Sequence, residues 1–283
     1  MRGVLTVLIT GGSSGIGKHL AATYLQRGDR VIIVADKAAK LAEATKELTR
    51  ISRHIASVTC DVSDSAAVRA MVESVLRDYQ CPDVLVNNAG FAVYRSFDQS
   101  PIEEIEKLIS VNLLGALRCI HGFLPAMMQR RSGHIVNIAS IAGLMPITPC
   151  ATYGAAKHGL VGISETLRFE LHDFDVKVHL VCPGRVKTSF FDHQTFQKRP
   201  RRPETEKTVP IEKVSQAIID AVEKDRFLTV IPKTLGWSVW VRNLYPALFD
   251  AWLGKLLTTR TREARTMNVD AENEDTAPCR TCS

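Results

Sequence analysis

Short apolar runs alternate with amphipathic stretches along most of the chain. The apolar runs are rich in valine and isoleucine and are largely apolar on both faces, which is typical of parallel strands covered by helices on each side. We predict strands at 5–10, 31–35, 55–60, 84–86, 134–139 and 177–181. We predict helices at 15–27, 37–50, 65–79, 102–130 and 153–172. The alternation predicts an α/β protein, with a doubly wound parallel sheet between two helical layers in a single domain.

Three segments depart from this alternation. Residues 189–210 are proline-rich and basic, and we predict a lid loop there. Residues 233–266 form an aromatic and basic C-terminal extension, which follows a main domain at 1–232. Residues 267–283 are polar and acidic without periodicity, and we predict that they are disordered.

Composition and charge narrow the range of partners and compartments. The chain has 283 residues, 45% hydrophobic and 23% charged, with a net charge of +6, as expected for one large α/β domain. We expect no nucleic-acid partner, because no basic run is interleaved with stacking aromatics. The first strand begins too early to leave room for a signal peptide, and no uninterrupted apolar window of membrane-spanning length occurs. We therefore expect a cytoplasmic protein, with membrane association open for the extension.

The spacing of the cysteines and histidines along the sequence is not typical of a metal site. Five of the seven cysteines are scattered through apolar contexts, as buried thiols in a reducing compartment are. Cys279 and Cys282 form a C-x-x-C pair in the polar tail, but no second ligand pair accompanies it. The eight histidines show no ligand spacing, so we predict no metal centre.

A glycine-rich turn, TGGSSGIG, follows the first strand and opens a helix. Glycines allow the tight turn and the close approach of a pyrophosphate, while the helix N-terminus attracts negative charge. We expect a dinucleotide to contact Gly11, Ser13, Ser14, Gly15, Ile16 and Gly17. Such a site is typical of a Rossmann-type sheet.

The charged residues beside this turn bear on the choice of dinucleotide. Asp36, at the end of the second strand, can accept both adenosine ribose hydroxyls and would repel a 2′-phosphate, which favours NAD over NADP. An alternative role for Asp36 is the N-cap of the next helix. Lys18 or Lys37 could instead pair with a 2′-phosphate.

Tyr153 and Lys157 lie four residues apart, so one helix face carries both. An ammonium beside a phenol lowers the phenol's pKa from about 10 toward neutrality. Tyrosine then becomes usable as a proton donor and acceptor. Ser140 lies thirteen residues upstream of the tyrosine. Together with the nucleotide turn, these residues suggest hydride transfer to or from an alcohol or ketone.

The motifs in this order resemble those of the short-chain dehydrogenase/reductase family over about residues 5–190. TGGSSGIG resembles the family's TGxxxGxG turn, and Asn87 to Gly90 spell its NNAG motif. The other matches are Asp61-Val62 (an adenine contact), Asn112 in VNLLG, the triad Ser140, Tyr153 and Lys157, and Pro183-Gly184 with Thr188 as PGxxxT.

The resemblance implies a role for each matching residue. Tyr153 would exchange a proton with the substrate oxygen, and Lys157 would bind the nicotinamide ribose and hold down the tyrosine pKa. Ser140 would donate a hydrogen bond to the substrate oxygen, and Asn112 would position a water that links Lys157 to solvent. The implied cofactor contacts also include Asp61, Val62, Asn88, Ala89, Gly90, Tyr153, Pro183, Gly184 and Thr188.

The C-terminal part of the chain bears on the substrate. FLTVIP and the aromatic extension replace the glycine-rich VDGG-like strand near which carrier-protein reductases of the family end. The chain is more similar to members that act on hydrophobic alcohols and ketones, such as hydroxysteroid, retinol and ketosphinganine reductases. We predict an NAD(P)-dependent oxidoreductase that interconverts a secondary alcohol and a ketone on a lipid, steroid or polyketide-like substrate.

Two other functions remain open. One is a 3-oxoacyl thioester reductase, which would hold the phosphate of coenzyme A or a carrier protein with the basic lid residues Lys198, Arg199, Arg201 and Arg202. The other is a nucleotide-sensing scaffold without turnover, although such a protein has typically lost the tyrosine or the lysine.

The residues of the extension suggest three alternative roles. Its apolar residues could close the substrate pocket, form an oligomer contact or insert into a membrane surface. In the last case Trp240, Leu248, Trp252 and Leu256 would insert while Lys255, Arg260, Arg262 and Arg265 meet anionic headgroups. The family resemblance also implies a homodimer or homotetramer, formed through the helices at 102–130 and 153–172.

Overall fold

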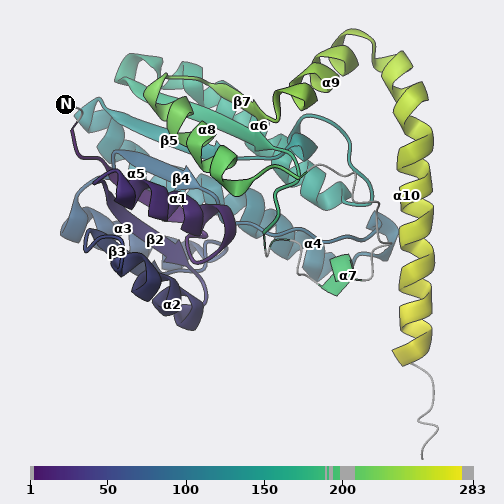
Figure 1. Cartoon of the computed structure of the whole chain (residues 1–283), viewed down its shortest axis with the longest axis horizontal. Helices are drawn as coiled ribbons and strands as arrows, with labels where there is room; N and C mark the ends of the chain where they lie inside the picture. Colours follow the sequence, from purple (N-terminus) through teal and green to yellow (C-terminus); the bar gives the residue numbers. More distant parts are fainter. Residues whose placement is uncertain (1–2, 189, 191–193, 198–207, 276–283) are drawn as a thin grey trace, which may run out of the picture.

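The computed structural model contains a seven-stranded parallel sheet in the order β3-β2-β1-β4-β5-β6-β7 (Figure 1). It describes residues 3–188, 190, 194–197 and 208–275. The strands are β1 (Thr6–Thr10), β2 (Arg30–Ala35), β3 (Ile55–Thr59), β4 (Val84–Asn87), β5 (Gly133–Ile138), β6 (Val176–Pro183) and β7 (Leu228–Ile231). The strand order reverses between β1 and β4, which confirms the predicted doubly wound sheet. Six of these strands lie within two residues of their predicted bounds at each end, and β7 is not predicted.

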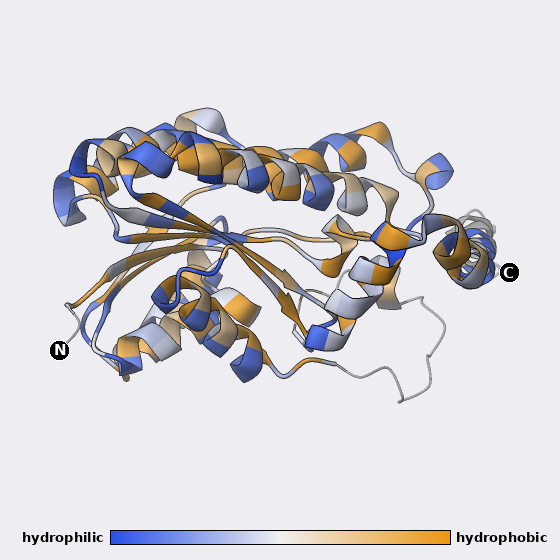
Figure 2. Ribbon diagram, turned by 90° about the horizontal axis from the view of Figure 1, so that it is seen from above, coloured by the Kyte–Doolittle hydropathy of each residue, from blue (hydrophilic) through white to orange (hydrophobic). Residues whose placement is uncertain are grey.

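Helices cover both faces of the sheet (Figure 2). One layer contains α1 (Gly15–Gln26), α2 (Ala38–Thr49) and α8 (Ile211–Glu223), of which α8 is not predicted. The other contains α3 (Ser65–Tyr79), α4 (Ile102–Ile109), α5 (Gly115–Arg130) and α6 (Ala151–Glu170). Short turns lie in the connections: η1 (Phe97–Gln99), η3 (Ile141–Gly143), η4 (His172–Phe174) and α7 (Gln194–Gln197).

The central strands send alternate side chains into two cores. On β1, Val7 and Ile9 pack in the cluster that includes residues of α1 and α8, whereas Leu8 packs in the cluster of α3 and α5. All three side chains are fully buried. Burial of each contributes about 1.5–3 kcal/mol to stability. Coverage on both faces explains why consecutive positions in these strands are apolar.

The segment predicted as one helix over 102–130 is interrupted. Between α4 and α5 lies a π-helical turn, η2 (Ser110–Leu114). Within it, Asn112 Nδ2 donates to Leu108 O at 3.0 Å, so a side chain takes up a carbonyl of the preceding turn. Among the described helices, this is the only stretch long and apolar enough to cross a membrane by length and composition. Here it packs against α3 and α6.

The C-terminal extension begins at Lys233 with α9 (Lys233–Leu244) and continues as α10 (Pro246–Asp275), which lies along one side of the molecule (Figure 1). The predicted disorder from residue 267 is wrong as far as Asp275, because α10 continues to that residue. Its sequence lacks an apolar period but is rich in good helix formers, and Pro246 occupies the first helical position. Residues 276–283, with Cys279 and Cys282, lie outside the described residues.

Candidate active site

A cleft of ≈ 940 Å³ lies along the carboxyl ends of the strands, across the point where the strand order reverses. Most of the predicted contact residues line it: Gly11, Ser13, Ser14, Gly15, Ile16, Asp36, Asp61, Val62, Asn88, Ala89, Gly90, Ser140, Tyr153, Lys157, Pro183, Gly184 and Thr188. Gly17 and Asn112 lie behind the wall. The segments that the motifs mark are therefore brought together along one surface.

The NNAG segment holds the glycine turn in place. Asn88 Nδ2 donates to Thr10 O at 3.0 Å and to Gly11 O at 3.2 Å, while Thr10 Oγ1 accepts from the backbone N–H groups of Asn88 and Ala89. A Cβ on Gly17 would lie 2.4 Å from Gly11 O and 2.7 Å from Asn88 Nδ2. Only glycine therefore allows α1 to begin this close to the turn.

One end of the cleft combines a carboxylate with two ammonium groups. Asp36 is exposed directly after β2, and Lys37 and Lys40 line the same wall. Asp36 is not a helix cap: the N-cap of α2 is Lys37, without a side-chain cap bond. Lys18 Nζ lies 2.6 Å from Glu47 Oε2, so this lysine already has a carboxylate partner.

Asp61 is held at the rim by its neighbours. Its carboxylate accepts from Ser63 N at 2.8 Å, from Ser63 Oγ at 2.7 Å and from Lys107 Nζ at 2.9 Å. Burial raises the pKa of Asp61, but these hydrogen bonds outweigh it and the pKa lies below its ordinary value. Asp61 therefore stays a carboxylate at neutral pH.

Ser140, Tyr153 and Lys157 meet where β5 ends and α6 begins. Ser140 follows β5 with extended backbone, and its Oγ accepts from Ala142 N at 3.1 Å, which caps η3. The same side chain lies near the phenol of Tyr153 and lowers its pKa. Lys157, one turn further along α6, is 4% exposed, and its Nζ donates to Ile138 O at 2.8 Å. Phenol, hydroxyl and ammonium therefore share one wall of the cleft.

The structure does not lower the pKa of Tyr153 as predicted. Desolvation in the cleft wall raises the pKa of Tyr153, and the nearby Ser140 hydroxyl lowers it by less. Lys157 Nζ lies 5.7 Å from the centre of the tyrosine ring. Burial also lowers the pKa of Lys157, to about 8. Burial thus outweighs the attraction between charges on which the prediction relied.

Asn112 lies behind Lys157 in the π-helical turn. Its Nδ2 donates to Phe91 O at 2.9 Å as well as to Leu108 O. Its Oδ1 is buried and has no hydrogen-bond partner among the described residues. A Cβ on Gly90 would lie 2.4 Å from this oxygen and 3.8 Å from Lys157 Nζ. The absence of a side chain at Gly90 therefore leaves an acceptor oxygen and an ammonium on either side of one small space.

The wall near Tyr153 is largely apolar, and sequence reasoning identified only part of it. Phe190 packs edge-on against Tyr153, and Phe196 packs against Tyr94, with ring centres 5.8 and 5.7 Å apart. Further lining residues come from the connections that follow β4 and β5 and from the extension: Phe91, Ile141, Ala142, Ile147, Thr148, Cys150, Leu235 and Arg260. No sequence motif marks these residues, because they share only their place in the folded cleft. The lid cations predicted to hold a phosphate, residues 198–202, lie outside the described residues.

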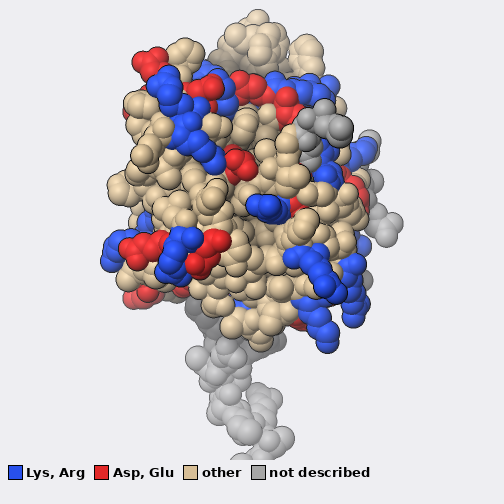
Figure 3. All heavy atoms as spheres, turned by 90° about the vertical axis from the view of Figure 1, so that its left-hand side faces the viewer, with Lys and Arg blue, Asp and Glu red and all other residues tan. Residues whose placement is uncertain are grey.

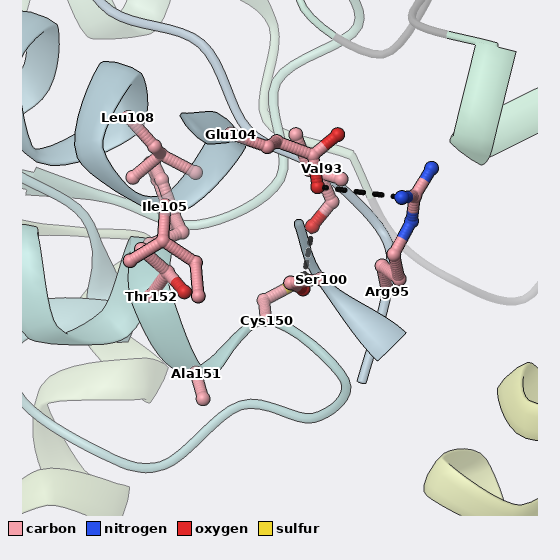
Figure 4. A pocket seen from close by; sticks show the side chains of 10 residues that line it. Val93, Arg95, Ser100, Glu104, Ile105, Leu108, Cys150, Ala151 and Thr152 are labelled. Carbon is pink, nitrogen blue, oxygen red and sulfur yellow. Dashed lines mark hydrogen bonds and ion pairs between the residues drawn. The ribbon is translucent and has the colours of Figure 1, made fainter. Parts of the chain in front are cut away.

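A small hollow of ≈ 10 Å³ lies behind this wall, between α4 and the start of α6 (Figure 4). Cys150 Sγ points to Val93 O at 3.3 Å, and Arg95 Nη1 lies 3.8 Å from Glu104 Oε1. The hollow is too small for any organic ligand. The large cleft is therefore the candidate active site.

Comparison with known proteins places the chain in a family. The short chain dehydrogenase family model matches residues 5–199. The chain belongs to this family. It is therefore an oxidoreductase, a dehydrogenase or reductase that acts on CH–OH groups with a nicotinamide cofactor.

Individual relatives cover most of the chain. Dehydrogenase/reductase SDR family member 7B of Rattus norvegicus is 29% identical over 272 residues, which are 92% of this chain and 82% of the relative. Epidermal retinol dehydrogenase 2 of Mus musculus is 30% identical over 245 residues, covering 85% and 78%.

Solved structures share the fold over a similar length. A short-chain dehydrogenase from Sphingobium yanoikuyae in complex with NADPH gives a TM-score of 0.75 at 28% identity, covering 89% of this chain and 95% of that one. A family member from Burkholderia phymatum in complex with NAD gives 0.78 at 24% identity with the same coverage, a likeness of fold alone.

Proposed function

We propose that the protein interconverts a secondary alcohol and a ketone on a hydrophobic substrate, with Tyr153 as general acid and base. The observation that carries this proposal is the meeting of Ser140, Tyr153 and Lys157 on one wall of the cleft, with the glycine turn at its other end. Proton transfer and dinucleotide binding then take place in one continuous space.

The residues present fit a nicotinamide dinucleotide. The cleft is at the upper end of the range for ligand sites, which leaves room for a dinucleotide and a substrate together. The start of α1 offers free backbone N–H groups and positive dipole charge to a pyrophosphate. Asp36 would bind the adenosine ribose, Val62 and Ala89 would flank the adenine side, and Gly184 and Thr188 would hold the nicotinamide end. The bound cofactor supplies or accepts the hydride.

The protein's own residues would manage the proton. Ser140 Oγ would donate a hydrogen bond to the substrate oxygen as negative charge builds on it. Tyr153 would give its phenol proton to that oxygen during ketone reduction, and its raised pKa keeps the phenol protonated for this step. Alcohol oxidation requires the phenolate instead, so its rate is expected to rise with pH.

Lys157 and Asn112 would restore the proton. With a pKa of about 8, Lys157 is mostly an ammonium at neutral pH. Its place between Ile138 O and the space beside Gly90 suits an ammonium that holds a ribose and a water. The unpartnered Asn112 Oδ1 is the acceptor that would fix this water. Lys157 and this water would then connect Tyr153 to solvent as a path for protons.

The apolar wall supports a hydrophobic substrate. Phe91, Ile147, Phe190, Phe196 and Leu235 surround the space beside Tyr153. Burial of lipid or polycyclic surface against such a wall provides binding energy without specific polar contacts. Reduction of a 3-oxoacyl thioester is the second candidate, since Arg260 adds a cation to the cleft wall that a phosphate could pair with.

Two finer assignments belong to the same proposal. We favour NAD over NADP because Asp36 is exposed at the adenosine end, although Lys37 and Lys40 stand beside it. We also propose a homodimer or homotetramer formed through α4–α5 and α6. In support, Ala155 is exposed on α6 and a Cβ on Gly162 would meet no atom within 4 Å, so a neighbouring helix could approach closely.

The test is turnover measured by nicotinamide absorbance. NADH and NADPH are each offered with a steroid ketone, a long-chain ketone and a 3-oxoacyl-CoA. The proposal predicts turnover of an apolar ketone that falls by about 10²-fold or more in Ser140→Ala. Preference for the acyl-CoA would favour the second candidate. Dinucleotide binding without turnover of any of the three would overturn the enzymatic proposal in favour of a sensing role.

A further inference from the structure

Helices α9 and α10 present an apolar surface to solvent. We define this aromatic surface as Trp237, Trp240, Val241, Leu244, Tyr245, Leu248, Trp252 and Leu256, each more than a third exposed. As many large exposed apolar side chains lie in this one stretch as in the rest of the described chain. Trp252 reaches 76% exposure. Such a concentration marks an interaction surface.

Packing on the body of the protein leaves most of the surface of these side chains exposed. A separate face of α10 already packs on the body of the protein, where Phe249 and Ala264 are 5% and 2% exposed. On α10, Leu248, Trp252 and Leu256 recur at spacings of four, and Trp252 lies against the buried Phe249 with ring centres 6.2 Å apart. Trp237 and Trp240 also pack on each other, with ring centres 5.5 Å apart. More than half of each tryptophan is nevertheless exposed, so a partner outside the chain is the physical explanation for this exposure.

The charge around the aromatic surface identifies the kind of partner. Residues 233–266, which include the aromatic surface, contain six basic and two acidic side chains, and the four further acidic residues of α10 follow only from Asp270 onward. Lys255 and Arg262 are exposed on α10 beside the aromatic surface. On the face at the amino ends of the strands, by contrast, acidic and basic side chains are intermixed (Figure 3). Tryptophan and tyrosine flanked by cations are what an anionic headgroup layer accommodates.

The same helices are fixed to the rim of the cleft. Thr148 Oγ1 donates to Leu257 O at 2.8 Å, and Arg242 Nη1 donates to Leu144 O at 2.6 Å. Arg265 Nη2 lies 3.2 Å from Asp98 Oδ1. Leu235 of α9 and Arg260 of α10 are part of the cleft wall itself. Whatever binds the aromatic surface therefore lies next to the mouth of the cleft.

We propose that the aromatic surface docks on the headgroup layer of an anionic phospholipid bilayer and turns the cleft mouth toward that bilayer. A second copy of the chain fits less well, because a two-fold contact would bring the two sets of basic side chains together. Supply of an apolar substrate from the bilayer would follow, and this consequence alone rests on the proposed function.

Intrinsic fluorescence gives a direct test, because all three tryptophans of the chain lie in the aromatic surface. The full chain is titrated with vesicles of phosphatidylcholine and phosphatidylserine, and with vesicles that carry brominated acyl chains. The proposal predicts a blue shift of the emission and quenching by the brominated lipid, both weakened by salt. In Trp252→Glu and Leu248→Glu, the lipid concentration at half-saturation should rise by about tenfold or more.

The control is Tyr79→Glu, which changes an exposed aromatic, 45% exposed at the end of α3, outside the aromatic surface and outside the proposed subunit contact. It should bind vesicles like the wild type. Equal loss in this control, or unchanged emission at millimolar lipid, would overturn docking. An emission shift that depends on protein concentration without lipid would overturn it in favour of self-association. Tyr153→Phe should bind vesicles normally, so failure of the proposed chemistry and failure of docking are distinguishable.

Discussion

Replacement of Lys157 by methionine should make the protein more stable while it abolishes turnover. The fall of the Lys157 pKa from 10.5 to about 8 means that burial of the ammonium destabilises the folded protein by about 3 kcal/mol at pH 7. Methionine removes this penalty but leaves Ile138 O without its donor, which costs about 1–2 kcal/mol. The net expectation is a gain of about 1–2 kcal/mol in the free energy of unfolding, or about 2–6 °C in Tm.

The stability difference between Lys157→Met and the wild type should depend on pH. Because the folded pKa of Lys157 is lowered, the unfolded chain binds more protons between about pH 8 and 10.5. Wild-type stability therefore gains from this group as pH rises through that window, whereas the variant does not. The advantage of the variant should shrink by about 2 kcal/mol between pH 7 and pH 9.5.

Urea unfolding at the two pH values, without added cofactor, measures this difference. Lys177→Met is the matched control: Lys177 is a partly exposed lysine whose pKa is raised by a hydrogen bond to Asp175, so no gain at pH 7 is expected. Destabilisation of Lys157→Met by more than about 1 kcal/mol at pH 7, or a difference that does not change with pH, would refute the reasoning.

Other parts of the structure give further predictions. Burial, assisted by His179, lowers the pKa of His134 to about 4, so stability should fall by up to about 3 kcal/mol as pH drops from 6.5 to 4; urea melts of wild type and His134→Phe across this range check it. Gly17→Ala should weaken dinucleotide binding by about tenfold or more in calorimetry, because its Cβ collides with Gly11 O. Asp36→Ser should raise kcat/KM for NADPH relative to NADH, and an unchanged ratio would remove Asp36 from cofactor choice. Asn112→Ala should lower kcat while Kd for the dinucleotide changes little, as stopped-flow and equilibrium titration can show.

The sheet is predictable because each of its strands is marked by a short run of consecutive apolar residues. Strands such as β1 are apolar at consecutive positions since both faces are covered, and this pattern is visible without the fold. Glycine at position 17 and the NNAG segment are likewise visible, because each satisfies a steric or hydrogen-bonding demand of one turn.

The features that escaped prediction depend on contacts distant in the chain. The π-helical turn at Asn112 could not be predicted, because the amphipathic pattern of the sequence continues on both sides of it. The raised pKa of Tyr153 reflects burial by segments from several connections, whereas the sequence shows only the neighbouring lysine. Leu235 and Arg260 reach the cleft because α9 and α10 return to its rim, which no motif in the extension announces.

The proposed function depends above all on proton transfer by Tyr153 in this cleft, and Tyr153→Phe removes the phenol that would carry it out. Tyr94→Phe is the matched control, since Tyr94 also lines the cleft but packs against Phe196. With the best ketone substrate, kcat should fall by about 10²–10⁴-fold in Tyr153→Phe, with dinucleotide Kd nearly unchanged, and should stay within about threefold of wild type in Tyr94→Phe. Wild-type kcat in Tyr153→Phe would contradict the account.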